Sequence, residues 1–324
     1  MMKKEDLRIV YMGTPDFAVE SLRALVEGGY NVVGVITMPD KPAGRGMKLQ
    51  YSPVKQYALE VGIPLLQPEK LKNEEFLSEL KAWNADLQIV VAFRMLPEVV
   101  WDMPRYGTFN LHASLLPQYR GAAPINWAVI NGDKETGITT FFLQHEIDTG
   151  NVIKQEKVTI EDTDNAGIVH DKLMTLGARL VCETVDQVLK GDLTAIPQDE
   201  MAQKAGELRA APKIFKDTCR IDWKQNTDQI YNLIRGMAPY PAAWTELVEE
   251  DGKRTMVKIY ETAKEHVGSG LPIGTLSSDS KSFLHVATSD GSIKILSLQI
   301  AGKKRMSVDE FLRGFRFSDT MLFE

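Results

Sequence analysis

The chain has 324 residues, of which 44% are hydrophobic and 25% are charged, and its formal net charge is -6. This is the composition of a globular protein, which excludes a disordered chain, and the length favours two domains over one. The two cysteines, Cys182 and Cys219, lie far apart in the sequence and form no CxxC pair, which argues against a disulfide framework and a zinc cluster.

The first part of the chain alternates short apolar runs with helical patterns. Its opening segment, MMKKEDLRIVYMG, carries charges but no apolar signal-peptide region, and no run of 18 apolar residues follows. We therefore expect a cytoplasmic protein without a membrane span. Strands are predicted over residues 7–13, 30–37 and 86–93, and helices over residues 16–27 and 73–83. Buried strands that alternate with helices predict a parallel α/β sheet.

Two polar residues mark the end of a further predicted strand, residues 107–112. Another strand is predicted over residues 136–143, and helices over residues 124–131 and 165–190. Ligands of open α/β sheets bind beyond the carboxyl ends of strands, and residues two apart on a strand share a face. Asn110 and His112 are therefore expected to face one site.

An aspartate follows the next predicted strand, in the sequence HEIDTGN. A carboxylate such as that of Asp148 can fix the tautomer of a neighbouring imidazole and support its charged form. The residue types alone leave an alternative open, in which His112 is a structural histidine of the core and Asp-Thr-Gly is an ordinary turn.

The remainder of the chain has a different pattern. Residues 191–211 show little periodicity and are predicted to link an α/β domain at residues 1–190 to a β-rich domain at residues 212–324. The second domain contains a helical pattern at residues 228–236 and the alternating runs TMVKIYE and GSIKILSLQI, with hairpin signals at Asp251-Gly252 and Asp290-Gly291. Its residues are slightly basic on balance, whereas the first part of the chain is acidic.

The most informative stretch is FNLHASLLPQYRGAAPINWAV, which runs from Phe109 to Val129. Its pattern Asn-x-His-x-Ser-Leu-Leu-Pro, followed by Tyr-Arg-Gly, resembles the signature of the folate-dependent formyltransferases. The resemblance implies a Rossmann-like N-terminal domain and 10-formyltetrahydrofolate as formyl donor, and we expect no metal. It also implies that Asn110, His112 and Asp148 are catalytic. In the family's usual assignment Asn110 donates to the formyl oxygen, His112 assists, and Asp148 orients His112 and relays protons.

The same resemblance implies a folate pocket. Six residues match positions that contact the carrier in the family: Met95, Leu96, Ser114, Leu115, Leu116 and Pro117. Phe93-Arg94 departs from the Tyr-Gly that is common beside the pocket wall, and His145-Glu146 departs from a frequent glycine-bearing pattern before Asp-Thr-Gly. Alternatively, Leu-Leu-Pro simply packs a loop onto the core. Ser114 lacks the G-x-S-x-G context of a hydrolase nucleophile, so we expect direct formyl transfer without a covalent enzyme intermediate.

A Gly- and Pro-rich basic loop, KPAGRGMKLQYSPVK from Lys41 to Lys55, is suited to reaching phosphates. It resembles the acceptor-stem loop of the family members that act on methionyl-tRNA, which implies tRNA contacts by Lys41, Arg45 and Lys48, with Arg45 entering the acceptor end. An ordinary solvated basic loop is the alternative.

Two motifs further along, RIDW at residues 220–223 and NLIRGMAPYPAAW at residues 232–244, resemble the second domain of the same members. That domain is a small open β-barrel of OB type. The resemblance suggests a basic triplet as a contact to the tRNA backbone, namely Lys303, Lys304 and Arg305. Such a triplet is otherwise ordinary solvated surface.

The resemblance thus implies an enzyme that transfers a formyl group from 10-formyltetrahydrofolate to the α-amine of initiator methionyl-tRNA, and we expect it to be a monomer. A sugar-nucleotide formyltransferase would share the centre but has no obvious use for the basic loop. A dinucleotide-binding oxidoreductase is disfavoured because the first turn, MGTPDFAV, lacks GxGxxG. His112, His145 and Asp148 do not have an established metal-ligand spacing.

Overall fold

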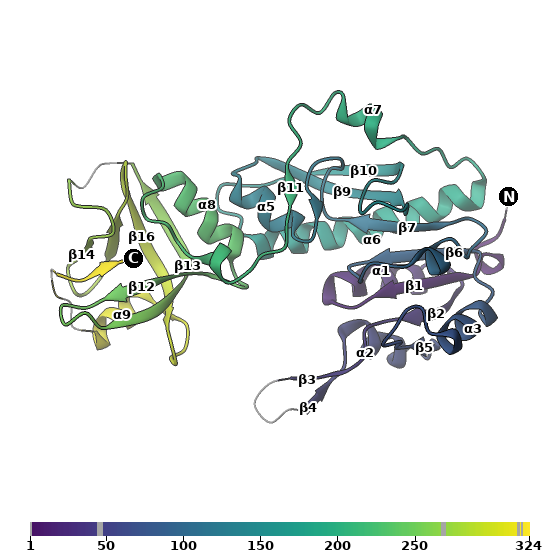
Figure 1. Ribbon diagram of the computed structural model, residues 1–324, viewed down its shortest axis with the longest axis horizontal. Helices are drawn as coiled ribbons and strands as arrows, with labels where there is room; N and C mark the ends of the chain where they lie inside the picture. The colour runs from purple at the N-terminus through teal and green to yellow at the C-terminus, as the bar shows by residue number, and fades with distance from the viewer. Residues whose placement is uncertain (1, 44–47, 267–269, 316–317, 319) are drawn as a thin grey trace. The chain divides into compact units, whose positions relative to one another are not determined.

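The computed structural model describes residues 2–43, 48–266, 270–315, 318 and 320–324 (Figure 1). Its contacts divide the chain into two units. The first unit comprises the chain up to Gly121, Gly137–Val158 and His170–Ala210, and the second comprises Ala122–Thr136, Thr159–Val169 and Ala211–Glu324. No helix among the described residues is both long and apolar enough to cross a membrane.

A seven-stranded sheet forms the centre of the first unit, in the order β10-β9-β7-β6-β1-β2-β5. Its strands are β1 (Ile9–Gly13), β2 (Val32–Ile36), β5 (Leu65–Leu66), β6 (Leu87–Val91), β7 (Thr108–His112), β9 (Glu135–Phe142) and β10 (Val152–Thr159). The predicted parallel arrangement is confirmed from β5 through β2, β1 and β6 to β7. By contrast, β9 runs antiparallel to β7, with Phe109 opposite Phe142.

The helices predicted in this part of the chain are present at nearly the expected bounds. The helical segments up to residue 202 are η1 (Lys4–Asp6), α1 (Asp16–Glu27), α2 (Pro53–Glu60), α3 (Glu74–Ala82), α4 (Glu98–Trp101), α5 (Pro124–Ile130), α6 (Ala166–Lys190) and α7 (Gln198–Ala202). Local signals explain two of these starts: the Asn73 side chain accepts hydrogen bonds from the first turn of α3, and Pro53 occupies the first turn of α2.

The segment predicted as a loop from Lys41 to Lys55 contains regular structure. Strands β3 (Lys41–Ala43) and β4 (Lys48–Gln50) pair antiparallel, and α2 then begins at Pro53. The hydroxyl of Ser52 accepts a hydrogen bond from the Lys55 amide, so the end of the segment is a capped helix start rather than a loop.

The second unit contains an antiparallel sheet in the order β14-β15-β16-β13-β12-β18, with β17 paired to β16. Its elements are η2 (Asp217–Cys219), α8 (Thr227–Met237), β12 (Ala243–Val248), β13 (Arg254–Glu265), β14 (Leu276–Ser278), β15 (Leu284–Ala287), β16 (Ser292–Ile300), β17 (Met306–Ser307), α9 (Val308–Gly314) and β18 (Leu322–Phe323). A bridge between Thr275 and Leu322 joins the two edges, so the sheet nearly closes. This confirms the small β-barrel predicted for the C-terminal part.

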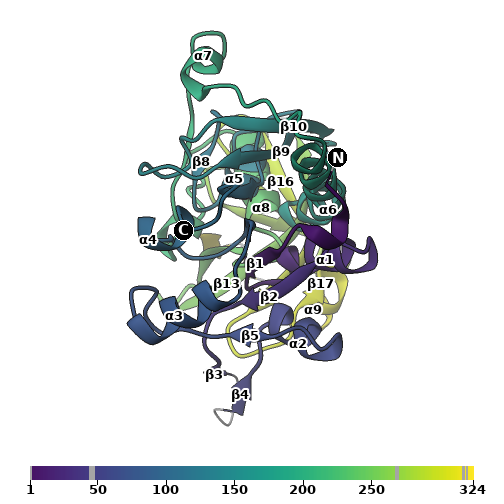
Figure 2. The same ribbon diagram turned by 90° about the vertical axis from the view of Figure 1, so that its right-hand side faces the viewer.

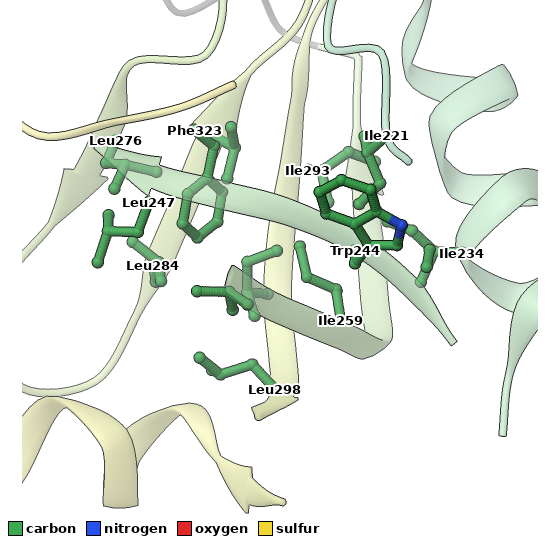
Figure 3. Close-up of a cluster of buried hydrophobic side chains, with 14 of the residues drawn as sticks. Ile221, Ile234, Trp244, Leu247, Ile259, Leu276, Leu284, Ile293, Leu298 and Phe323 are labelled. Carbon is green, nitrogen blue, oxygen red and sulfur yellow. The ribbon is translucent and has the colours of Figure 1, made fainter. Parts of the chain in front are cut away.

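The barrel is filled by side chains from several strands and from α8 (Figure 3). Ile259, Ile293 and Leu298 project inward from the central strands, and the Trp223 ring stacks on Phe323 at a centroid distance of 5.7 Å. Inward-facing apolar residues on alternating positions of a closed sheet supply the core of such a domain.

Segments from the middle of the chain also belong to the second unit. Asn126 of α5 donates from its side chain to the Gly236 carbonyl of α8 at 2.7 Å. Arg235 donates to the carbonyls of Glu161 and Asp164, at 3.2 and 2.9 Å. Residues 122–136 and 159–169 are therefore structural parts of the unit that contains the barrel.

The segment that follows α6 belongs to the first unit as far as Ala210. Its described elements are α7 and the short strand β11 (Ala210–Ala211), which pairs with β8 (Arg120–Gly121). Figures 1 and 2 both show α7 beyond the β10 edge of the first unit's sheet. A bridge between Val152 and Ile196 attaches the segment there.

Candidate active site

Asn110 lies on β7 between the buried residues Phe109 and Leu111. Its side chain forms no hydrogen bond with the described residues, and its Oδ1 atom is buried. A buried polar atom without a partner costs about 1–3 kcal/mol in general, so such a group is poorly explained by stability alone. The amide is instead available for a bound molecule.

His112 ends the same strand and is only 6% exposed. Its Nε2 lies 2.9 Å from the Tyr119 carbonyl oxygen, and the Phe141 ring packs edge-on against the imidazole. A carbonyl can only accept a hydrogen bond, so this contact assigns a hydrogen to Nε2. Nδ1 is the nitrogen that faces Asp148, at 3.9 Å from Oδ2.

Asp148 reaches His112 through a loop rather than from a strand end. Because β9 is antiparallel, its last residue, Phe142, lies opposite the start of β7, and the chain has to return toward His112. Asp148 has a φ of 56°, in the left-handed region, and its Oδ2 accepts a hydrogen bond of 3.0 Å from the Gly121 amide. The Asp148 carboxylate is thus held toward Nδ1 of the imidazole.

The predicted folate loop is held by a local hydrogen bond and by bonds with residues of β9 and β10. The Ser114 hydroxyl donates to the Gln118 carbonyl at 2.6 Å, and the Leu116 carbonyl accepts from Gln155 at 2.7 Å. Leu116 and Pro117 are buried, whereas Leu115 is half-buried. Of the four side chains, Leu115 is therefore the one best exposed to a ligand.

The two residues of the predicted pocket wall differ in environment. Met95 is 74% exposed, whereas Leu96 is 8% exposed and packs in an apolar cluster with Val100. An exposed methionine can adapt to an apolar ligand because its side chain is unbranched and flexible. Leu96 instead anchors the loop to the core.

The departure at Phe93-Arg94 has a structural role that the sequence did not reveal. Arg94 donates to the carbonyls of Pro68 and Glu69, and its guanidinium lies 5.6 Å from the centroid of the Phe93 ring. Burial lowers the pKa of Arg94. The arginine therefore ties the loop that carries Met95 to the segment after β5.

The basic loop is anchored at its base by an ionic cluster. Asp40 accepts hydrogen bonds from Lys55 at 2.5 Å and from Gln67 at 2.9 Å, and these two donors lower the pKa of Asp40. Lys41 is exposed at the start of β3 and Lys48 begins β4. Arg45 lies outside the described residues.

The basic triplet of the second unit is divided between two kinds of environment. Lys303 and Lys304 are exposed between β16 and β17. Arg305 donates to the Ser297 hydroxyl and to Glu261, and its guanidinium lies over the Tyr260 ring. The two lysines are therefore better suited than Arg305 to contact another molecule.

Three residues around Asp148 were not identified from the sequence as site residues. Gly121 donates to its carboxylate, Gln198 donates to its carbonyl oxygen, and Arg120 donates to Gln198. Arg120 and Gly121 stand in the quoted Tyr-Arg-Gly pattern, which was a usable signal. Gln198 stands in the aperiodic segment and had none.

Comparisons with known proteins agree with this architecture. A family model described as formyl transferase matches residues 7–185, and one described as formyl transferase, C-terminal domain, matches residues 213–316. The methionyl-tRNA formyltransferases of Bacteroides thetaiotaomicron and Bacteroides fragilis are 69% and 70% identical to the chain over 318 residues, which is 98% of each protein compared.

A solved structure shares the fold at much lower identity. It is the N-formyltransferase from Helicobacter canadensis in complex with folinic acid and dTDP-3-aminofucose. The match is 18% identical with a TM-score of 0.63, and it covers 93% of this chain and 100% of the other. At this identity the likeness concerns the fold alone.

Proposed function

This chain belongs to the formyl transferase family, and we propose that Asn110, His112 and Asp148 form the centre at which it transfers a formyl group to methionyl-tRNA. The acceptor follows from the full-length relatives at 69% and 70% identity, both of which are methionyl-tRNA formyltransferases. The observation that best supports the centre is the Asn110 side chain, whose buried Oδ1 has no partner among the described residues, on the same strand as His112, whose imidazole faces Asp148.

The formyl donor belongs to the formyl-tetrahydrofolate class, and we propose that it is 10-formyltetrahydrofolate. It supplies a formyl carbon that an amine can attack, with a nitrogen as leaving group. The Asn110 side chain suits the formyl oxygen of such a donor because its amide carries N–H donors, and its Oδ1 atom has no partner among the described residues. Leu115 and Met95 offer apolar surface for the carrier, and the backbone from Ser114 to Pro117 frames it.

The geometry suggests a separate task for each side chain. Asn110 donates a hydrogen bond to the formyl oxygen, where negative charge develops as the amine nitrogen bonds to the formyl carbon. Since Nε2 of His112 is hydrogen-bonded to the Tyr119 carbonyl oxygen, we assign proton transfer to Nδ1 of the same ring. The 3.9 Å separation between Nδ1 and Asp148 is too long for a direct hydrogen bond, but one amine or water can contact both atoms.

The proton balance of the reaction closes within this centre. The attacking amine loses a proton to His112, and the Asp148 carboxylate stabilises the resulting imidazolium. The same proton then passes to the carrier nitrogen as its bond to the formyl carbon breaks. No protein atom bonds to the formyl group.

One chain supplies the three proposed side chains. We therefore propose that the enzyme acts as a monomer, in the cytoplasm where charged tRNA is used.

The function is tested by measuring formyl transfer from 10-formyltetrahydrofolate to three acceptors: charged initiator tRNA, charged elongator tRNA and a dTDP-amino sugar. We expect efficient formylation of initiator methionyl-tRNA and little product from the other two. Faster formylation of the amino sugar would favour the sugar-nucleotide alternative. Equal rates with both tRNAs would show that the acceptor is not restricted to the initiator species.

The basic loop gives a prediction about the acceptor. Arg45→Ala should raise the KM for methionyl-tRNA by about 10-fold, because one phosphate or acceptor-end contact is lost, and should leave the KM for the folate donor nearly unchanged. Steady-state kinetics with each substrate varied in turn measures both values. Arg105→Ala, which removes an exposed arginine elsewhere in the first unit, is the matched control. An equal loss for both substrates would contradict the proposed role of the loop.

A further inference from the structure

Gln198 is a buried polar residue in the segment that follows α6. It is 2% exposed, although its neighbours Asp199 and Glu200 are exposed. Its Nε2 donates to the carbonyl oxygens of Asp148 and Gly150, each at 2.8 Å. A short helix of the connecting segment therefore holds the backbone on both sides of Thr149.

Arg120 fixes which way the Gln198 amide points. Its Nε and Nη2 atoms donate to Oε1 of Gln198 at 3.0 and 2.8 Å. Arginine has donors only, so Oε1 must face it, and the flipped amide would place two N–H groups against the guanidinium. Both N–H groups of Gln198 are thereby directed to the carbonyls of Asp148 and Gly150.

The bond from Gln198 helps to hold Asp148 in an uncommon backbone conformation. Its φ of 56° is uncommon for a residue other than glycine, and such backbone persists where surrounding contacts hold it. One contact is the Gly121 amide on the carboxylate, and the other is Gln198 on the carbonyl. Together they hold both ends of the residue while its carboxylate faces His112.

The segment that carries Gln198 also contacts the backbone that binds His112, the residue that Asp148 faces. The backbone carbonyl of Tyr119 accepts the hydrogen bond from His112. The backbone amide of Tyr119 donates to the Arg209 carbonyl at 2.7 Å. The Gln118 side chain adds three bonds, one from the Arg209 amide and two to the carbonyls of Ala205 and Glu207. Residues near both ends of the segment 196–209 therefore contact the backbone around the candidate centre.

We propose that Gln198, oriented by Arg120, is a positioning residue for Asp148. The segment 196–209 would then fix the position of the Asp148 carboxylate relative to the His112 imidazole. The inference rests on the proposed function, because it assigns Gln198 an effect on turnover through Asp148. It differs from a passive connection between domains, which would tolerate any substitution that preserves folding.

Gln198→Glu is the sharpest variant because it keeps the size of the side chain and an acceptor for Arg120 but loses both N–H donors. We expect kcat to fall about 10-fold, as for other residues that orient a reacting group, with the KM of both substrates nearly unchanged. Gln203→Ala, which removes an exposed glutamine just after α7, is the matched control and should retain wild-type kcat. Thermal unfolding of each variant shows whether the fold is kept.

A double-mutant cycle separates positioning from a general structural effect. In an Asp148→Asn background, Gln198→Glu should cause little further loss, since the group it positions has already been disabled. A full 10-fold loss in both backgrounds, or wild-type kcat in folded Gln198→Glu, would overturn the proposal. If Asp148→Asn alone retains wild-type kcat, the catalytic assignment fails instead, so the two failures are distinguishable.

Discussion

Asn110→Ala is expected to lower kcat by about 10²- to 10³-fold, the usual cost of removing a hydrogen-bond donor to a developing oxyanion. The Asn110 amide makes no hydrogen bond within the described residues, so truncation should not break a structural contact. Binding of methionyl-tRNA should remain nearly intact, because the donor acts mainly as the reaction proceeds. Single-turnover formyl transfer and a filter-binding titration measure the two quantities on the same preparation.

Two companion variants sharpen this test. Asn110→Asp keeps the size of the side chain but replaces its N–H groups with an oxygen, and it should be at least as impaired as the alanine variant. Retention of wild-type kcat by Asn110→Asp would rule out the donor role. His112→Ala should also lose turnover by about 10²- to 10⁴-fold, the range expected for loss of a general acid-base group.

Gly150→Ala is expected to disable the enzyme by displacing the Asp148 loop. A Cβ atom at Gly150 would lie 1.6 Å from the Phe142 carbonyl oxygen, so the backbone must move. A shift of about 1 Å in a catalytic group can cost on the order of 10²-fold in rate, and overpacking typically costs about 1–3 kcal/mol of stability. Single-turnover kinetics and denaturant unfolding measure these two effects.

Gly314→Ala is the control for this substitution, because a Cβ atom there would meet no heavy atom within 4 Å. It should leave turnover unchanged and have little effect on stability. Wild-type turnover in Gly150→Ala would mean that the Asp148 loop can shift without consequence, and it would weaken the assignment of that carboxylate.

The central strands of the first unit's sheet could be predicted because burial and apolar composition coincide in them. Every residue of β1 and of β6 is buried, and Gln88 is the one polar residue in these two strands, so each appears as an apolar run. By contrast β10, at the edge of the sheet, is mostly half-buried or exposed, and its sequence VIKQEKVT carries no such run. The antiparallel direction of β9 was also hidden, because a strand's own residues do not record the direction of its partner.

The site could be predicted only in part. Asn110 and His112 are two apart on one strand, so their common location is a local property of the sequence. Asp148 needed the family resemblance, since its approach to His112 depends on a loop that folds back. Gln198 left no signal at all, because its partners include two backbone carbonyls that any residue could supply. Long-range contacts of this kind become visible only in the folded chain.

The interleaving of the two units limits how such enzymes can be recombined. Residues 122–136 and 159–169 belong to the unit that contains the barrel, although they precede the connecting segment. A chimera joined within that segment would pair α8 of one parent with the Asn126 and Asp164 regions of the other. Exchange of acceptor specificity among relatives therefore requires matched changes on both sides of the junction, and a single crossover does not transfer one complete module.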